Sequence, residues 1–231
     1  MPYWTHSDFD IGENVVSPYL WSRGFSRLDA VAITHAHADH IGGIPAVLSN
    51  FRPRELWLGA QFPELESFSE KARAMGAAVV RRSRGDVFAL GGTTIRVLAP
   101  TAEKTATLSS TRRNNESLVM KVTYRDTAVL LEGDAERPTE KRIAAEEPAA
   151  DLLKVGHHGS ATSTIPEFLA AVRPRFAVIS VGARNNYGHP RREVLNRLRA
   201  SGVRTFRTDM NGAVTFYLDG KDVTPQTAAL P

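Results

Sequence analysis

Short apolar runs alternate with segments of helical spacing in the first third of the chain. Residues 28–34 (LDAVAIT) have the length and composition of a buried strand, and residues 42–50 begin with glycines and Pro45, as helices often do. A second strand is expected at 55–58, a helix at 63–75, and a strand rich in β-branched residues at 77–81. This part of the chain therefore predicts alternating strands and helices.

The middle of the chain contains consecutive strands, and the last part returns to alternation. Gly91-Gly92 and Arg125-Asp126 separate the runs of an expected antiparallel meander. The expected strands are 87–90, 93–98, 117–124, 127–131, 151–155, 176–181, 204–207 and 213–218, with helices at 139–146, 165–172 and 193–200 and a turn at Met210-Asn211-Gly212. Two mixed sheets packed face to face with helices outside fit this order better than one doubly wound sheet.

Composition adds limits to this picture. With 231 residues, 42% of them hydrophobic, and no linker, the chain is expected to form a single domain over residues 1–231. The absence of cysteine excludes disulfides and thiolate ligands. The first residues lack the features of a signal peptide, and no apolar run reaches about eighteen residues, so we expect a soluble chain.

The formal net charge of +4 arises mostly from arginine, for example in the cluster Arg81, Arg82 and Arg84. A basic surface suits an anionic polymer, because neutralising its phosphates releases counterions. Such clusters are also typical of ordinary solvated faces, so charge alone does not identify a partner.

Four residues of metal-binding type lie within six positions directly after the first predicted strand. In this HAHADH segment, His35 and His37 point the same way if the backbone is extended, so they can bind one ion. Asp39 and His40, in the following turn, can face a second ion. A surface run of polar residues is the alternative, but histidine seldom clusters in this way without a metal.

Two later strands deliver further candidates at their ends. Asp134 follows an apolar run and Gly133, which permits a tight turn, and His157 follows the run LLKVG. Each residue alone is more typical of a cap or a satisfied polar group than of a metal ligand. Together, three strand-end clusters favour a binuclear site in which these two residues are candidates for the bridge and the closing ligand.

Taken together, these motifs resemble those of a known protein family. The HxHxDH motif, LLEGD, LLKVGHHGS and the run NNYGHP at 185–190 resemble the metallo-β-lactamase superfamily and, within it, the C-terminal hydrolase domain of ComEC-type DNA-uptake channels. The similarity extends from about Phe9 to Gly212. It implies an α+β fold, the four-layer αββα sandwich. The opening strands of the family, with their Asp-Val-Gly-Gln-Gly-Asp-like motif, are absent from this chain.

The resemblance also implies a ligand set for two divalent ions. Imidazole and carboxylate ligands without sulfur accept zinc, manganese or iron, and of these we expect zinc or manganese. The histidine that the family usually has between HxHxDH and the bridging aspartate is missing. An Asn-Asn-x-Ser-Leu pattern at 114–118 stands there instead, so Asn115 or water is expected to take its place. The implied roles are His35 and His37 on the first ion, Asp39 and His40 on the second, Asp134 as the bridge and His157 as the closing ligand.

Two ions about 4 Å apart lower the pKa of a shared water and stabilise both reacting oxygens of a phosphodiester. The expected nucleophile is thus a hydroxide bridged by two metals and held by the hydrogen bond that it donates to the carboxylate of Asp39. The leaving oxygen needs a proton or positive charge, for which His158 and His189 are candidates; either one could orient a phosphate instead. The candidate substrate-binding residues are Asn115, Ser160, Tyr187 and Arg184.

The predicted function is that of a metal-dependent phosphodiesterase or nuclease acting on DNA during uptake. One alternative is a metallo-hydrolase of another ester, such as a lactone, a thioester or a phosphocholine ester. The other is a non-catalytic DNA-binding domain or degenerate fragment. The expected partners are DNA or another phosphodiester and a membrane channel domain of the same or a neighbouring protein, with the oligomeric state left open. The resemblance implies the outer face of the inner membrane, and a free-standing chain would be cytoplasmic.

Overall fold

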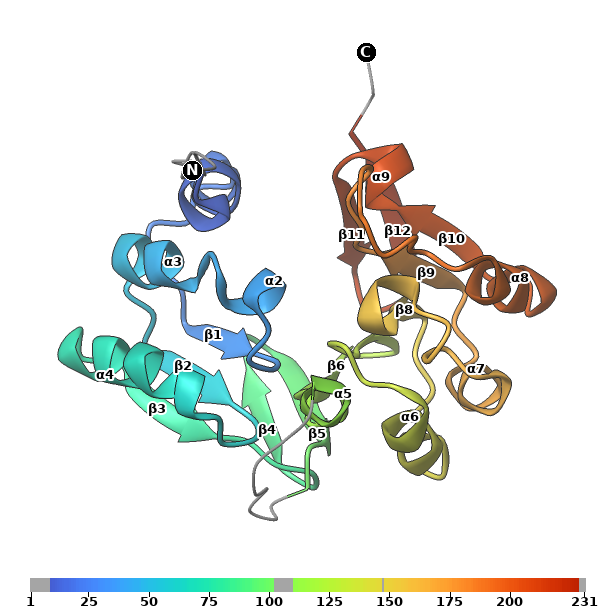
Figure 1. The fold of residues 1–231 in the computed structure, drawn as a ribbon, viewed down its shortest axis with the longest axis horizontal. Coiled ribbons are helices and arrows are strands. Elements are labelled where there is room, and N and C mark those ends of the chain that lie inside the picture. The colour runs from blue at the N-terminus through green and yellow to red at the C-terminus, as the bar shows by residue number, and fades with distance from the viewer. Residues whose placement is uncertain (1–8, 102–109, 147, 229–231) are drawn as a thin grey trace, which may run out of the picture. The chain divides into compact units, whose positions relative to one another are not determined.

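The computed structural model describes residues 9–101, 110–146 and 148–228 (Figure 1). The chain divides into two compact units, Met1–Arg81 and Arg82–Pro231. Among the described residues, none of the helices is long and apolar enough to cross a membrane.

The first unit is built on a three-stranded parallel sheet. The strands β1 (Ala30–Ile33), β2 (Glu55–Leu58) and β3 (Ala78–Arg81) pair in that order. The sheet is wholly parallel, so the expectation of two mixed sheets is wrong here: a helical connection, rather than a hairpin, joins each strand to the next. The helices of this unit are η1 (Gly12–Val16), α1 (Ser17–Ser22), α2 (Ala38–Ile41), α3 (Ile44–Phe51), η2 (Pro63–Leu65) and α4 (Glu66–Ala74).

The helices η1 and α1 were not predicted from the sequence. Asp10 begins this segment, and its carboxylate accepts hydrogen bonds from the backbone N–H groups of Gly12 (2.7 Å) and Glu13 (3.0 Å). The segment also requires glycine at 12, because a Cβ atom there would lie 2.1 Å from the carbonyl oxygen of Gly43. The capping signal was therefore present in the sequence, but the helices are too short to give a clear period.

The second unit is built on a seven-stranded mixed sheet with the strand order β10-β9-β8-β7-β6-β5-β4. Strands β4 to β7 pair antiparallel, which confirms the predicted meander, and β7 to β10 pair parallel. The strands are β4 (Val87–Leu90), β5 (Thr93–Ala99), β6 (Val119–Tyr124), β7 (Thr127–Leu131), β8 (Leu152–Lys154), β9 (Phe176–Ile179) and β10 (Arg204–Arg207).

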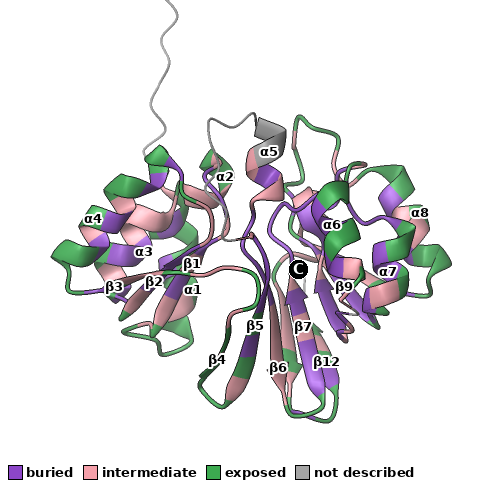
Figure 2. Cartoon of the chain, turned by 90° about the horizontal axis from the view of Figure 1, so that it is seen from below, coloured by how far each residue is buried: buried purple, intermediate pink, exposed green. Residues whose placement is uncertain are grey.

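The two faces of this large sheet are covered by different elements, because side chains alternate between faces along each strand. On one face, Leu153 and Ile179 join a core with residues of α6 (Arg137–Ala144), α7 (Pro166–Val172) and α8 (Arg192–Ala200). On the other face, Phe176 packs with the hairpin of β11 (Val214–Leu218) and β12 (Val223–Thr227). Figure 2 shows the buried strands and the exposed outer positions of the three helices.

The prediction of a turn at Met210-Asn211-Gly212 between two paired strands is wrong. Thr208–Asn211 forms a short helix, α9, and the strands on either side belong to different sheets. The physical reason is that β11 does not pair with β10: it pairs with β12 in a separate two-stranded sheet. The strand β12 was not predicted. The remaining helical segments are α5 (Ser110–Asn115) and the short turn η3 (Gly156–Gly159).

Candidate metal centre

The candidate residues of both units lie just beyond the carboxyl ends of parallel strands. In the first unit, β1 leads directly into His35 and then α2. In the second unit, β7, β8 and β9 run parallel in register, with Leu131 opposite Lys154 and Lys154 opposite Val178. The segments that follow these strands therefore leave the sheet side by side, which is where open parallel sheets commonly bind ligands.

In the first unit, Thr34 orients two imidazoles. Its hydroxyl lies 3.1 Å from Nδ1 of His35 and 3.3 Å from Nδ1 of His40. The two rings pack against each other, with centroids 4.2 Å apart, and His35 is fully buried. Hydrogen bonding at Nδ1 directs the Nε2 atom of each ring away from Thr34, in the manner of outer partners that orient metal-binding histidines.

The four candidates of the first unit form two pairs. Nε2 of His35 lies 3.1 Å from Nδ1 of His37, and Nε2 of His40 lies 3.8 Å from Oδ2 of Asp39. Two nitrogen atoms bound at about 2.0–2.1 Å to one tetrahedral zinc ion lie about 3.3 Å apart. The His35–His37 separation is close to this value, so this pair fits a divalent ion, and the His40–Asp39 pair is about 0.5 Å wider.

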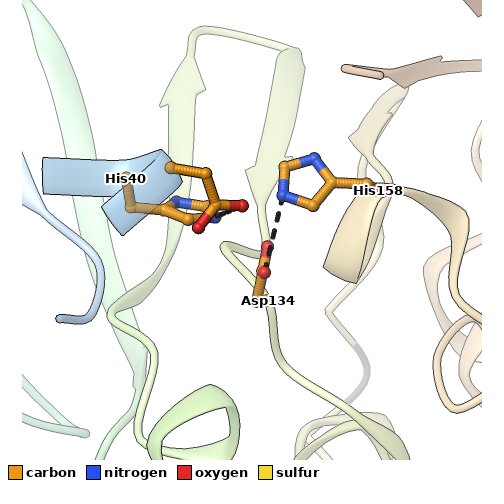
Figure 3. Close-up of side chains that lie close together, drawn as sticks. His40, Asp134 and His158 are labelled. Carbon is orange, nitrogen blue, oxygen red and sulfur yellow. Dashed lines mark ion pairs between the residues drawn. The ribbon is translucent and has the colours of Figure 1, made fainter. Parts of the chain in front are cut away.

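In the second unit, Asp134 is almost fully buried after the turn at Gly133, whose φ is 58°. The backbone N–H of Asp134 donates to Oγ of Ser117 (3.0 Å). The carboxylate faces two nitrogen atoms: Oδ1 lies 3.8 Å from Nζ of Lys154, and Oδ2 lies 3.6 Å from Nε2 of His158 (Figure 3). The buried carboxylate thus faces an imidazole nitrogen.

The tautomer of His158 is set from the opposite side of its ring. Nδ1 donates to the carbonyl oxygen of Ser180, just after β9, at 2.7 Å. With the proton on Nδ1, the lone pair is on Nε2, which faces Asp134. This arrangement, an imidazole fixed by a backbone carbonyl with its other nitrogen beside a carboxylate, fits a metal ligand.

His157 is connected to a different carboxylate. Its Nδ1 lies 3.0 Å from Oε1 of Glu136, which also accepts from Thr162 (2.9 Å) and Asn114 (3.4 Å). Burial acts to raise the pKa of Glu136, but hydrogen bonds from His157, Thr162 and Asn114 outweigh it and lower the pKa below its usual value. Glu136 is therefore ionised at neutral pH and anchors the His157 ring.

Both histidines of the HHGS motif have left-handed backbones, with φ of 45° at His157 and 52° at His158. Non-glycine residues rarely adopt this conformation, which costs of order 1–3 kcal/mol per residue unless the surroundings enforce it. Here Oγ of Ser163 donates to the carbonyl oxygen of Gly156 (2.9 Å), and Ser160 N–H donates to His157 O (2.8 Å). These hydrogen bonds hold the strained backbone of His157 and His158 in place at the candidate site.

His189 reaches the same region from the connection between β9 and α8. Its ring centroid lies 5.7 Å from that of His157, and its Nδ1 is buried without a hydrogen-bond partner among the described residues. Burial, followed by repulsion from His157 and Arg191, lowers the pKa of His189 below its usual value. The ring is therefore mainly neutral at pH 7.

The predicted substrate-binding residues have different surroundings. Asn115 binds Glu136 through both ends of its side-chain amide (3.2 and 3.3 Å), and the hydroxyl of the buried Ser160 lies 2.9 Å from that of Thr162. Both support the His157 network rather than facing solvent. Tyr187 and Arg184 are exposed on the connection between β9 and α8.

Sequence reasoning missed the residues that orient the candidates. Three of these residues could have been suspected from their positions next to the motifs. Thr34 directly precedes the HAHADH segment, Ser117 belongs to the Asn-Asn-x-Ser-Leu pattern, and Glu136 follows the LLEGD motif by two residues. The contact of Ser180 with His158 has no sequence signal, because a backbone carbonyl makes it.

The chain belongs to the metallo-β-lactamase superfamily, whose family model matches residues 5–183. Most members of this superfamily are metal-dependent hydrolases, and the cluster of potential ligands agrees with divalent metals. Two solved structures share the fold. One is CmlA, a diiron beta-hydroxylase from Streptomyces venezuelae (TM-score 0.55, 13% identity, covering 79% of this chain and 44% of that chain). The other is YhfI, a metallo-beta-lactamase fold protein from Bacillus subtilis (0.51, 14%, 84% and 80%).

Within the superfamily, the chain is similar to competence proteins. It is 37% identical to ComE operon protein 3 of Bacillus subtilis (strain 168), over 90% of this chain and 27% of that protein. It is 32% identical to competence protein ComA of Neisseria gonorrhoeae, over 92% and 29% of the two lengths. The chain thus spans between a quarter and a third of these relatives. The predicted α+β class, the metallo-β-lactamase fold and the resemblance to ComEC-type competence proteins are confirmed.

Proposed function

We propose that this chain is a metal-dependent phosphodiesterase or nuclease that acts on DNA during uptake. The observation that supports it best is the oriented pair of Asp134 and His158, in which a backbone carbonyl fixes the imidazole and its Nε2 atom lies 3.6 Å from a buried carboxylate. Superfamily membership makes a metal the expected occupant of such a pair.

The proposed ligands come from both clusters, and their combination rests on family membership. His35 and His37 would hold one ion, Asp39 and His40 the other, with Asp134 shared between them. The motif assigns the closing ligand to His157, but the contacts favour His158, because Glu136 already binds the His157 ring. Two zinc or manganese ions would supply the Lewis acidity that activates water and neutralises the phosphodiester charge.

The side chains would have separate tasks around the phosphodiester. Asp39 is exposed at the start of α2, so its carboxylate can orient a water molecule by a hydrogen bond. Because its pKa is lowered, His189 is better suited to accept a proton than to donate one at neutral pH. Lys154, whose Nζ donates to the carbonyl oxygen of Gly133 (2.8 Å), places its ammonium group beside Asp134.

DNA is the proposed substrate because of the relatives and the charge. Two of the relatives have names that refer to competence or recombination, both of which are processes of DNA: competence protein ComA and recombination protein 2 of Haemophilus influenzae. The net charge of +4 agrees with an anionic substrate. A membrane channel domain is the proposed partner, because the resemblance to ComEC-type DNA-uptake channels implies one and these relatives are several times longer than this chain.

The test combines metal content with cleavage. Elemental analysis after reconstitution with manganese or zinc should give about two ions per chain for the wild type and fewer for Asp134→Ala. The loaded wild type should cleave DNA but not a lactone or a thioester, and Asp134→Ala should be inactive. Metal binding without phosphodiester cleavage would favour a metallo-hydrolase that acts on another ester. A chain that binds no stoichiometric metal would instead favour the non-catalytic DNA-binding domain or degenerate fragment.

The assignment of the closing ligand has its own prediction, based on two adjacent variants. His158→Ala should lower the bound metal per chain, because it removes the imidazole that faces Asp134. His157→Ala should retain most of the metal, because its ring is bound to Glu136. Elemental analysis of both variants under one reconstitution protocol checks this, and the reverse order would return the ligand role to His157.

A further inference from the structure

Tyr187 presents an aromatic ring to solvent beside the candidate site. It is 74% exposed, the largest value among the exposed large hydrophobic side chains of the described residues. Exposed aromatic surface of this size is unfavourable in water, at roughly 25 cal/mol per Å² of apolar area. Its position in the connection that carries His189 indicates a ring available for binding.

The loop that carries Tyr187 is held at both ends. Nδ2 of Asn185 donates to the carbonyl oxygens of Gly182 (2.9 Å) and His189 (2.8 Å), and Oδ1 of Asn185 accepts from His189 N–H (2.9 Å). Beyond it, Arg191 N–H donates to the carbonyl oxygen of Gly159 (2.8 Å). The exposure of Tyr187 therefore belongs to a hydrogen-bonded loop, in which little ordering would be needed on binding.

The ring continues a series of aromatic side chains that starts at the site. Tyr187 stacks on His189, with an interplanar angle of 17° and centroids 5.9 Å apart. The His189 ring lies 5.7 Å from His157. A flat group stacked on Tyr187 would thus lie at the outer end of a row that leads through His189, a candidate catalytic imidazole, to His157.

The charge around this ring suits a nucleic-acid backbone. Residues 182–192 contain Arg184, Arg191 and Arg192 and neither aspartate nor glutamate. The guanidinium of Arg191 lies over Gly188, since a Cβ atom on that glycine would be 3.3 Å from Nη1. An exposed aromatic ring next to arginine is the combination by which proteins bind single-stranded nucleic acid, with bases stacked on rings and phosphates beside cations.

We propose that Tyr187 is a stacking platform for a base of single-stranded DNA and that Arg191 contacts the adjoining phosphate. This inference rests on the proposed function, because it places a nucleotide beside the proposed catalytic residues. Paired bases in a duplex are stacked on one another, so a duplex offers the ring no base face unless its strands separate. The site would therefore prefer single strands to duplexes.

The test compares two strands that carry the same charge. A fluorescent single-stranded oligodeoxynucleotide and a strand of equal length made of abasic residues are titrated with the 231-residue chain in EDTA, and binding is followed by anisotropy. Tyr187→Ala should bind the normal strand about tenfold more weakly, whereas Tyr187→Phe, which keeps the ring, should stay within about twofold of the wild type. Neither variant should change the affinity for the abasic strand.

Tyr217→Ala is the matched control, because Tyr217 is a 43% exposed tyrosine on β11 of the same unit. It should bind both strands like the wild type. Equal losses on normal and abasic strands, or a Phe variant as weak as Ala, would overturn the proposal. Because binding is measured without metal, its result is separate from cleavage: a chain that fails to cleave DNA but shows the predicted binding would overturn only the proposed function.

Discussion

Gly156 shows how tightly the segment with His157 and His158 is packed. A Cβ atom at this position would lie 2.8 Å from the carbonyl oxygen of Ala135 and 2.9 Å from Cδ of Glu132. The first contact is with backbone, so no side-chain rotation can relieve it. The residue is glycine for lack of space, since its φ is not in the left-handed region.

Gly156→Ala is therefore expected to destabilise the protein by about 1–3 kcal/mol, the usual cost of overpacking. Gly182→Ala is the matched control, because a Cβ there meets nothing within 4 Å, and it should change stability little. Urea denaturation of both variants measures the difference. Equal stability of the two would show that the His157 segment shifts freely.

At the scale of elements, two buried carboxyl groups tie neighbouring segments together: Glu132, directly after β7, bonds the first residue of η3, and Glu140, within α6, bonds the two residues that precede α7. Oε2 of Glu132 accepts from Gly156 N–H (2.8 Å), and Glu140 accepts from the backbone N–H groups of Thr164 and Ile165. Burial, followed by the charge of Glu140 and a hydrogen bond with it, raises the pKa of Glu132 well above its usual value. Burial also raises the pKa of Glu140. The folded chain thus retains one proton on this pair of carboxyl groups.

This retained proton gives a prediction for stability against pH. Above the ordinary glutamate pKa the unfolded chain releases a proton that the folded chain keeps, so stability falls as pH rises towards the raised pKa, by up to about 1.4 kcal/mol per pH unit. Glu132→Gln mimics the protonated group, so it should match the wild type at acid pH and be more stable at pH 8. Denaturation in EDTA at several pH values tests this, and parallel curves would contradict it.

For the whole molecule, bound metal should raise stability, because an ion that binds only the folded chain adds about 2.7 kcal/mol at a hundred times its Kd. Manganese or zinc should therefore raise the Tm of the wild type and have little effect on Asp134→Ala. Glu66→Ala, which removes an exposed carboxylate of α4, should respond like the wild type. Differential scanning calorimetry gives the comparison, and an equal rise in all three proteins would indicate binding elsewhere.

Much of the fold was predictable from the sequence, because short apolar runs between strong breakers define strands well. The strands at 55–58, 87–90, 127–131 and 204–207 have the predicted bounds. The carboxyl-end positions of Asp134 and the HHGS motif followed from the same reasoning. The resemblance assigned the ligand role to His157, but the directions of the two rings could not be predicted, because a left-handed backbone at both His157 and His158 removes the strand alternation on which such reasoning depends. The contacts from Glu136 and Ser180 then decide where each ring points.

The close approach of Gly159 to Pro190 has a consequence for engineering. A Cβ atom on Gly159 would lie 2.6 Å from Cβ of Pro190, so the segments that carry His158 and His189 are fitted to each other at this point. A chimera that takes only one of the two segments from a relative would place a mismatched surface at this contact. Grafting experiments should therefore transfer residues 156–160 and 185–191 together, and directed evolution of one segment should be run with compensating variation in the other.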